Sequence, residues 1–172
     1  MKSGLFTLAM LVLAGSACND DALKSKIPAE PQPPAQGAQA FVQVDNDHAQ
    51  PGDRISVFVR VQLGTENQAR IGSYTGRLTF DPAALGWVSD QQSSDGMRVV
   101  NPNGAAGGEV RFAGASAAGF NDLTLYTGTF EVKKAGYMDH LAIKMEELSA
   151  AKSLGSMRAD LRVAPQVFLR VQ

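Results

Sequence analysis

The sequence predicts an all-β fold, a sandwich of about nine strands that occupies residues 41–172. Ile, Val and Leu recur at every second position over residues 55–63, and this alternation buries one face of a strand while the other meets water. The turn residues Gly, Pro, Asn and Asp recur about every ten residues, a spacing typical of a sandwich. A domain of this size can bury a sufficient core without disulfides, and the single cysteine allows none to form within the chain.

The stretch at residues 71–85, IGSYTGRLTFDPAAL, is predicted to lie in the middle of this sandwich. Tyr74 and Phe80 share one parity of a strand, and the polar residues Ser73, Thr75, Arg77 and Thr79 occupy the other parity. Asp81-Pro82 then ends the pairing, because proline has no N–H and aspartate accepts hydrogen bonds in a turn. Leu85 begins the next apolar stretch. We therefore expect Phe80 and Leu85 to flank a turn and to be buried.

The other strands follow from the same alternation between turn signals. Residues 146–159 contain good helix formers followed by glycine, so they are interpreted as the end of a strand and then a loop or one helical turn. Pro165 should lie at a sheet edge or a bulge, where a missing N–H is tolerated. The expected strands are residues 41–44, 55–63, 71–80, 85–88, 97–100, 109–113, 123–132, 141–146 and 161–171.

The N-terminus is predicted to be a targeting segment. Lys2 precedes an apolar run at residues 5–14, LFTLAMLVLA, which is too short to span a bilayer core of ~30 Å and has the length of a signal-peptide core. Small residues then lead to Cys18, the only cysteine. This arrangement resembles a bacterial lipoprotein signal at residues 1–17, with Cys18 as the lipid attachment site, although Gly15 stands where such signals usually have leucine. The alternative is a plain secretory signal with a chance cysteine.

Residues 18–40 are predicted to be a flexible linker, because a segment rich in Pro, Ala and Gln cannot bury enough apolar surface to fold. The linker and the lipid would hold the domain at the bacterial cell envelope, outside the cytoplasm. Asn19 follows the cysteine in place of aspartate, which in enterobacterial-type sorting favours the outer membrane.

Three motifs resemble a cohesin domain over nearly the whole folded part. They are Pro51-Gly52-Asp53 before an alternating strand, LTFDPAALGWV at residues 78–88, and residues 119–132, which end in TGTFEV. The resemblance implies a nine-stranded jelly-roll sandwich and a non-catalytic role in binding a protein partner, which in cellulosomes is a dockerin. Related carbohydrate-binding modules share the fold and much of the pattern, so the alternative is a module that holds polysaccharide at the cell surface.

The resemblance also implies a binding face. In cohesins the third, fifth, sixth and eighth strands form one sheet, and its outer face meets the partner. The outward parity of the corresponding strands would present four basic residues and one acid, which suggests a basic patch for an acidic partner or glycan. The alternative is that these side chains only keep the sheet soluble. The expected face residues are Thr75, Arg77, Thr79, Arg98, Arg111, Lys144 and Glu146.

Other functions find little support in the sequence. The net charge of −1 and pI of about 6.1 argue against nucleic-acid binding, which usually requires a strongly basic domain. No set of acid, base and nucleophile is visible, so no enzyme and no cofactor are predicted. Asp45 and Asp47 could hold a structural calcium ion, but we interpret them as turn residues. Trp87 is expected in the core, which leaves Tyr126 and Tyr137 as possible exposed rings for glycan binding.

Overall fold

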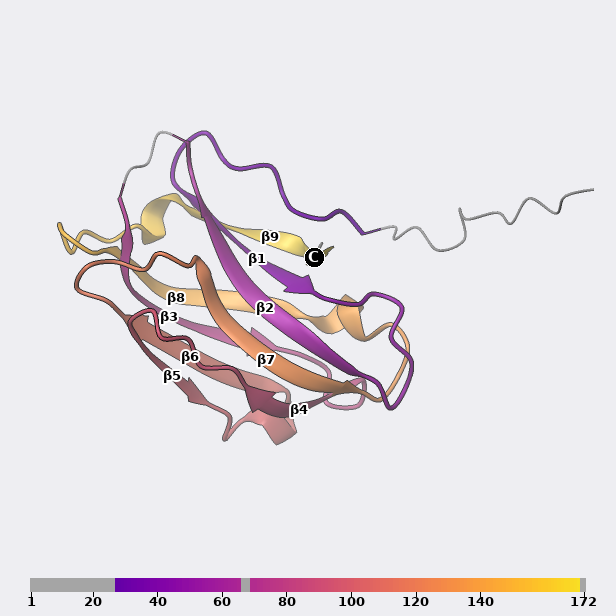
Figure 1. Cartoon of the computed structure of the whole chain (residues 1–172). Coiled ribbons are helices and arrows are strands. Elements are labelled where there is room, and N and C mark those ends of the chain that lie inside the picture. The colour runs from indigo at the N-terminus through magenta and orange to yellow at the C-terminus, as the bar shows by residue number, and fades with distance from the viewer. Residues whose placement is uncertain (1–26, 66–68, 171–172) are drawn as a thin grey trace, which may run out of the picture.

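The computed structural model describes residues 27–65 and 69–170, and it confirms an all-β sandwich of nine strands (Figure 1). Short 3-10 helices lie at Ala105–Gly107 (η2), Tyr137–His140 (η3) and Arg158–Asp160 (η4). No helix among the described residues is long and apolar enough to cross a membrane. The strands are β1 Ala38–Val44, β2 Arg54–Leu63, β3 Ile71–Thr79, β4 Leu85–Asp90, β5 Met97–Asn101, β6 Glu109–Ala115, β7 Thr124–Val132, β8 Ala142–Ala150 and β9 Leu161–Leu169.

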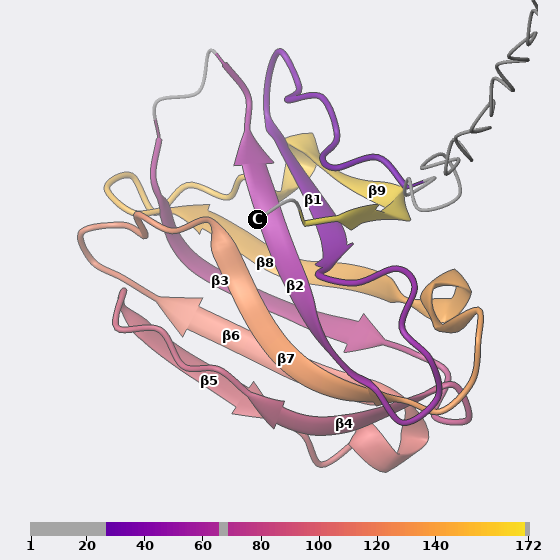
Figure 2. The ribbon, with the colours of Figure 1, turned by 45° about the vertical axis from the view of Figure 1, so that its right-hand side comes forward.

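The strands form two sheets that pack face to face (Figure 2). One sheet has the order β4-β7-β2-β1-β9 and the other the order β5-β6-β3-β8. The β1–β9 pair is parallel, and the other pairs are antiparallel. Strand β9 is an edge strand, and its register with β1 shifts between Ala40 and Val42, opposite the segment that contains Pro165. The prediction of an edge or bulge at Pro165 is therefore confirmed.

An aromatic cluster joins the two sheets inside the sandwich. The ring centroid of Tyr74 lies 5.2 Å from that of Phe120, and Phe112 stacks on Tyr126 at 5.4 Å. The Tyr74 hydroxyl donates a hydrogen bond of 2.8 Å to the Leu125 carbonyl oxygen of β7, so it connects the two sheets. Burial raises the pKa of Tyr74 to about 12, and the hydroxyl stays protonated as the donor.

The residues around the Asp-Pro turn lie in the core as predicted. Phe80 is 6% exposed and Leu85 is fully buried. The Asp81 carboxylate accepts the Ala83 N–H at 2.8 Å, and the Asp81 carbonyl oxygen accepts the Leu85 N–H at 2.9 Å. This turn therefore brings the chain from β3 in one sheet to β4 in the other.

The burial of three aromatic residues differs from prediction. Trp87 is only partly buried against the core, because β4 is an edge strand, and its indole N–H donates to the Tyr126 hydroxyl at 3.1 Å. Tyr126 and Tyr137 are 3% and 2% exposed, so the expectation of exposed rings is wrong. The register shift between β2 and β7 after Val59 accompanies the burial of both Leu125 and Tyr126, which simple alternation cannot predict.

Two segments are more ordered than predicted. Strand β8 runs to Ala150 because it pairs with β3 along its length, and this pairing outweighs the helix propensity of residues 146–150. Strand β1 begins at Ala38, and residues 27–37 lie against the domain through contacts such as the hydrogen bond from the Gln43 side chain to the Ala29 carbonyl oxygen. The C-terminal part of the predicted linker is thus packed on the fold. The predicted signal at residues 1–17 and Cys18 lie outside the described residues.

Candidate functional site

The candidate site is the outer face of the four-stranded sheet, here called the 5-6-3-8 face. Cross-strand pairing sets which side chains share this face, because partners directly opposite one another point to the same side of a sheet. Arg77, for example, lies opposite Arg111 of β6 and Lys144 of β8. The face comprises Met97, Val99 and Asn101 of β5, Glu109, Arg111, Ala113 and Ala115 of β6, Ser73, Thr75, Arg77 and Thr79 of β3, and Ala142, Lys144, Glu146, Glu147 and Ser149 of β8.

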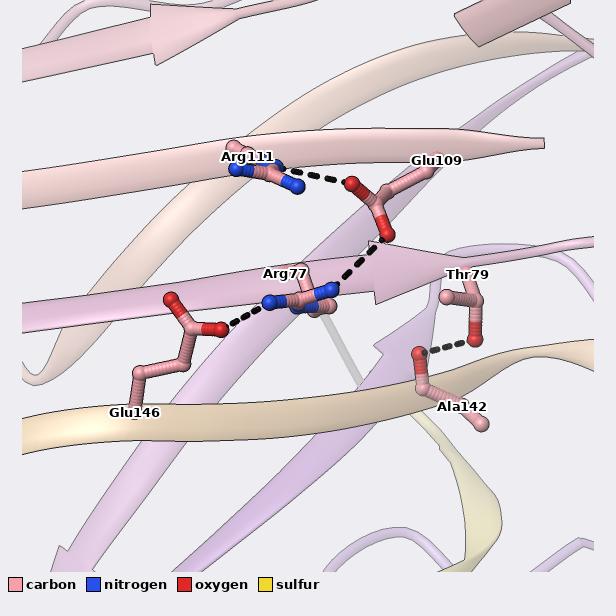
Figure 3. A network of polar contacts seen from close by, with 6 residues as sticks. All are labelled: Arg77, Thr79, Glu109, Arg111, Ala142 and Glu146. Atoms are coloured by element: carbon pink, nitrogen blue, oxygen red, sulfur yellow. Dashed lines mark hydrogen bonds and ion pairs between the residues drawn. The ribbon is translucent and has the colours of Figure 1, made fainter. Parts of the chain in front are cut away.

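Arg77 lies at the centre of a network of ion pairs on this face (Figure 3). Its guanidinium donates to Glu109 at 3.2 Å and, through the other terminal nitrogen, to Glu146. The Nε–H of Arg111 donates to the second oxygen of Glu109 at 2.8 Å. The carboxylates therefore offset the repulsion between Arg77, Arg111 and Lys144, which would otherwise meet as like charges across the strands.

The network shifts the pKa values of its members. The hydrogen bond from Arg111 lowers the pKa of Glu109, and the hydrogen bond from Arg77 lowers that of Glu146. The hydrogen bond to Glu146 in turn raises the pKa of Arg77. All three side chains are thus held in their charged forms, and the network stays intact over the neutral pH range.

The prediction of a basic patch on this face is wrong. Three acids, Glu109, Glu146 and Glu147, balance the three basic residues Arg77, Arg111 and Lys144. The register of the β3–β8 pair shifts between Thr75 and Gly76, and Glu146 is the extra residue of β8 at that point. Two consecutive residues, Glu146 and Glu147, therefore both lie on the outer face. Glu147 accepts a hydrogen bond of 2.9 Å from Ser73, while Glu146 contacts Arg77. The position of Glu109 on this face can be predicted from the sequence, because Glu109 and Arg111 are two residues apart on one strand and so point to the same side.

Arg98, a predicted member of the face, lies on the opposite side of its strand. Its guanidinium reaches across the end of the sandwich and donates to the Asp95 carbonyl oxygen at 3.2 Å and to that of Thr124 in β7. Its Cζ atom also lies 4.9 Å from the centre of the Phe120 ring. Strand β5 therefore points Arg98 and Val100 inward and exposes Met97 and Val99, the reverse of the predicted parity.

The β5 side of the face is apolar. Met97 is 71% exposed and Val99 is 58% exposed, and they border a shallow hollow of about 230 Å³. Its other lining residues include Thr75, Ala113 and Ala115. Large apolar side chains grouped at a surface commonly mark an interaction site. The 5-6-3-8 face thus has an apolar part on β5 and β6 and a charged, neutralised part on β3 and β8.

The other predicted residues are two threonines on the 5-6-3-8 face and two aspartates that were considered for calcium. Thr75 and Thr79 lie on the face, and the Thr79 hydroxyl donates to the Ala142 carbonyl oxygen at 3.3 Å. Asp45 accepts the Ser56 N–H at 2.8 Å, and Asp47 lies 3.9 Å from His48. In the part of the chain that the structure describes, no group of three or more His, Cys, Asp or Glu residues is arranged to hold a metal ion.

Replacing Glu146 with glutamine is expected to change how stability depends on pH. The folded-state pKa of Glu146 lies below its ordinary value of 4.5, so its contribution to stability is present above that pH and is lost as the pH falls through the folded-state pKa. Wild type should therefore melt at a higher temperature than Glu146→Gln at pH 7, and the two melting temperatures should converge as the pH falls below that ordinary value and through the folded-state pKa. A difference that stays constant with pH, or one that also appears in Glu131→Gln on the opposite sheet, would contradict this.

Comparison with known proteins places this geometry in a family. The family model for the cohesin domain matches residues 40–158, and no curated protein matches the chain. Similar folds occur in the sixth cohesin of scaffoldin B from Acetivibrio cellulolyticus, solved in complex with a mutant Cel5 dockerin (13% identity, TM-score 0.56, 78% of this chain and 99% of that chain). A non-cellulosomal cohesin from the archaeon Archaeoglobus fulgidus is also similar, with 17% identity and a TM-score of 0.55. The match covers 78% of this chain and 91% of that chain.

A third similar structure is the type I cohesin–dockerin complex from Clostridium thermocellum (16% identity, TM-score 0.54, 78% of this chain and 99% of that chain). At these identities the structures show a shared fold. The sheet order, the nine strands and the match of the family model over most of the chain agree with one another. The chain therefore belongs to the cohesin family.

Proposed function

We propose that this protein is a lipid-anchored, non-catalytic cohesin domain that presents the 5-6-3-8 face to a protein partner at the bacterial cell envelope, outside the cytoplasm. The observation that carries the proposal is the apolar pair Met97 and Val99, 71% and 58% exposed beside the ion-pair network. Burial of such side chains by a partner is favourable by about 25 cal/mol for each Å² removed from water. Cohesins of similar fold bind dockerins, so a dockerin-like protein is the leading class of partner.

The buried aromatic residues favour a protein partner over polysaccharide. Flat glycan-binding faces usually carry exposed aromatic rings, whereas within residues 27–65 and 69–170 no Phe, Tyr or Trp side chain is exposed. The apolar part of the 5-6-3-8 face is aliphatic instead, and it adjoins fixed charges that can pair with those of a protein surface. We therefore keep polysaccharide binding as an outcome of the test and not as a second proposal.

Replacing both Met97 and Val99 with aspartate should weaken partner binding by about 30-fold or more, because truncation or charging of an apolar anchor costs ~2 kcal/mol or more. The mature protein would first be used to capture partners from the extracellular fraction of the source bacterium, with calcium present and with calcium chelated. Dissociation constants of the captured protein would then be measured by calorimetry. Because both side chains are exposed, the melting temperature should stay within a few degrees of wild type.

Val163→Asp is the matched control, since Val163 is 43% exposed on β9 of the other sheet. It should bind as wild type does. Equal affinity of the wild type and the Met97/Val99 variant would remove the 5-6-3-8 face from the proposal. Retention of the wild type on insoluble polysaccharide, without any captured protein, would favour the carbohydrate-binding alternative.

Replacing Cys18 with alanine should release the protein from the membrane or block its processing, because alanine has no sulfur atom for the lipid. The measurement is detergent partitioning of the expressed full-length chain, followed by separation of the inner and outer membranes. Asn19 after the cysteine predicts the outer membrane. Cys18→Ser serves as a second variant that keeps the size of the side chain. A mature protein that stays in the aqueous phase with Cys18 intact would contradict lipidation.

A further inference from the structure

Large side chains are buried on the outer face of the five-stranded sheet, the side turned away from the core. Phe41 is fully buried, and Phe168 and Gln43 are 2% and 1% exposed. Their neighbours on β1, such as Val42, point into the core between the sheets. In a two-layer sandwich the outer parity of a strand ordinarily meets water. This outer face must therefore have a cover of its own.

Residues 27–37, here called the strap, provide that cover. The Leu169 N–H donates to the Pro28 carbonyl oxygen at 2.9 Å, and the Thr65 N–H donates to that of Pro34 at 3.3 Å. Leu169 ends β9, whereas Thr65 follows β2, so the strap is held at two separate points on the sheet. Figure 2 shows this indigo segment running beside β9 and β1 before the chain turns into β1.

Polar and aromatic contacts join the middle of the strap to the sheet. The buried Gln43 amide donates to the Ala29 carbonyl oxygen at 2.8 Å and accepts from Arg60 at 3.2 Å. Arg60 also pairs with Glu30 and lies 5.9 Å from the centre of the Phe41 ring. Without the strap, the Gln43 amide would lose its carbonyl partner, which is costly for a buried polar group. The sheet surface is thus matched to this segment of the chain.

The family match does not extend to the strap. Both the strap and its hydrogen-bond partner on β9, Leu169, lie outside the residues 40–158 that match the cohesin model. The turn that leads from the strap into β1 uses Gly37 at φ +75°, where a Cβ would lie 2.3 Å from the Asp160 carbonyl oxygen. Several prolines also limit the freedom of the undocked segment, which lowers the entropy cost of docking.

We propose that the docked strap sets the length and the exit point of the membrane tether. This proposal rests on the lipid anchor at Cys18 proposed above. With the strap docked, the chain from Cys18 to Ile27 can span at most about 30 Å, whereas an undocked chain from Cys18 to Ala38 can span about 70 Å. The strap lies on the sheet opposite the 5-6-3-8 face. The tether therefore leaves from the back of the domain and keeps the binding face clear of the strap.

The first test measures docking in the full-length protein and does not depend on the lipid. Residues 28–36 would be replaced by a Gly-Ser sequence of equal length, and residues 19–26 would be replaced in the same way as the matched control. The first replacement should lower the melting temperature by about 5 °C or more and speed hydrogen exchange of the Leu169 amide at least about tenfold. The control should change neither. Unchanged stability and exchange in the first variant would overturn strap docking.

A milder variant guards against a replacement that fails to fold. Glu30→Ala removes the ion pair to Arg60 and the 3.4 Å hydrogen bond from the Gln62 side chain, both at the surface, so it should leave the melting temperature almost unchanged. It should still speed Leu169 amide exchange relative to Glu131→Ala, a control on β7 that does not touch the strap. If Glu30→Ala and the control exchange equally at Leu169, the Glu30 contacts play no part in docking and this element of the proposal is wrong.

The second test measures the reach of the tether. The lipidated protein, labelled with a fluorophore at Leu154→Cys, would be bound to vesicles of phosphatidylethanolamine and phosphatidylglycerol that carry acceptor dyes on their headgroups. Replacement of residues 28–36 should reduce energy transfer to the membrane, and replacement of residues 19–26 should not. Equal energy transfer in the wild type and both replacement variants would show that the strap does not set the reach of the tether. Docking of the strap would then still be decided by the first test. Failure of the protein to bind vesicles would instead overturn the lipid anchor, and with it the effect on reach.

Discussion

Replacing Phe80 with alanine is expected to lower the free energy of unfolding by about 3–5 kcal/mol, the range found for buried phenylalanine. Phe80 is 6% exposed, and its ring meets that of Phe130 edge-on with centroids 5.1 Å apart. Phe130 belongs to β7 in the other sheet, so the truncation would leave a cavity between the sheets. A domain of this kind is stable by only ~5–15 kcal/mol, and the loss would be a large share of that total.

The measurement is urea unfolding of the mature protein, with the slope of free energy against urea compared between variants. Val163→Ala is the control, because Val163 is 43% exposed on an edge strand and should change stability by less than about 1 kcal/mol. If Phe80→Ala loses no more stability than Val163→Ala, the ring of Phe80 does not stabilise the core in the way that its burial indicates.

The long strands of this fold could be predicted because their burial follows simple alternation. Residues 55–63 and 71–79 each have one face in the core and one outside it, and this period of two is visible in the sequence. Phe80 and Leu85 were placed correctly for the same reason, since Asp81-Pro82 marks the turn between them. The apolar pattern and the turn chemistry point to one structure here, which makes the local prediction reliable.

The binding face could be predicted only in part. Arg77, Arg111, Lys144 and Glu146 lie on the 5-6-3-8 face, but Arg98 does not. Strand β5 is short and has apolar residues at both parities, so alternation cannot choose its direction. The exposure of Glu147 accompanies an irregular register between β3 and β8, and such irregularities arise from pairing between distant strands.

The strap could not be predicted, because its stability comes from contacts with distant parts of the chain. A segment rich in proline and alanine lacks the apolar content to fold alone, and composition therefore indicates a linker. Glu30 meets Arg60, and Pro28 meets Leu169. Both are long-range contacts that a local pattern does not encode. The segment forms no strand of its own in the described residues and is ordered by the sheet that it covers.

The corrected charge distribution changes how the face should recognise a partner. A basic patch would attract any acidic protein over a Debye length of about 8–10 Å. The 5-6-3-8 face instead pairs Arg77 with Glu109 and Glu146, so its charges largely cancel at a distance. Specificity should then come from short-range fit to the ion pairs and to the Met97–Val99 surface. A partner that left these polar groups unmatched would be disfavoured by the cost of desolvating them.

Replacing Gly108 with alanine is expected to lower the free energy of unfolding by about 2–5 kcal/mol, through two separate effects. Gly108 has φ +83°, a conformation that costs about 1–2 kcal/mol for other L-residues. A Cβ there would also lie 2.2 Å from the Phe80 carbonyl oxygen and 3.0 Å from Pro82 Cδ. Overpacking of this kind typically adds about 1–3 kcal/mol, and here the neighbour is backbone that cannot turn aside as a side chain can.

Gly52→Ala separates the two effects, because Gly52 has φ +97° but no atom within 4 Å of the position that a Cβ would take. It should cost only the conformational part, about 1–2 kcal/mol, in parallel urea unfolding. The Gly108 carbonyl oxygen also accepts the Phe80 N–H at 2.9 Å, and Gly108 precedes Glu109, so its displacement should disturb the carboxylate that pairs with Arg77. Equal losses of stability in the two variants would contradict a clash at Phe80. A Gly108→Ala variant that bound partner as wild type does would show that Glu109 keeps its position despite that clash.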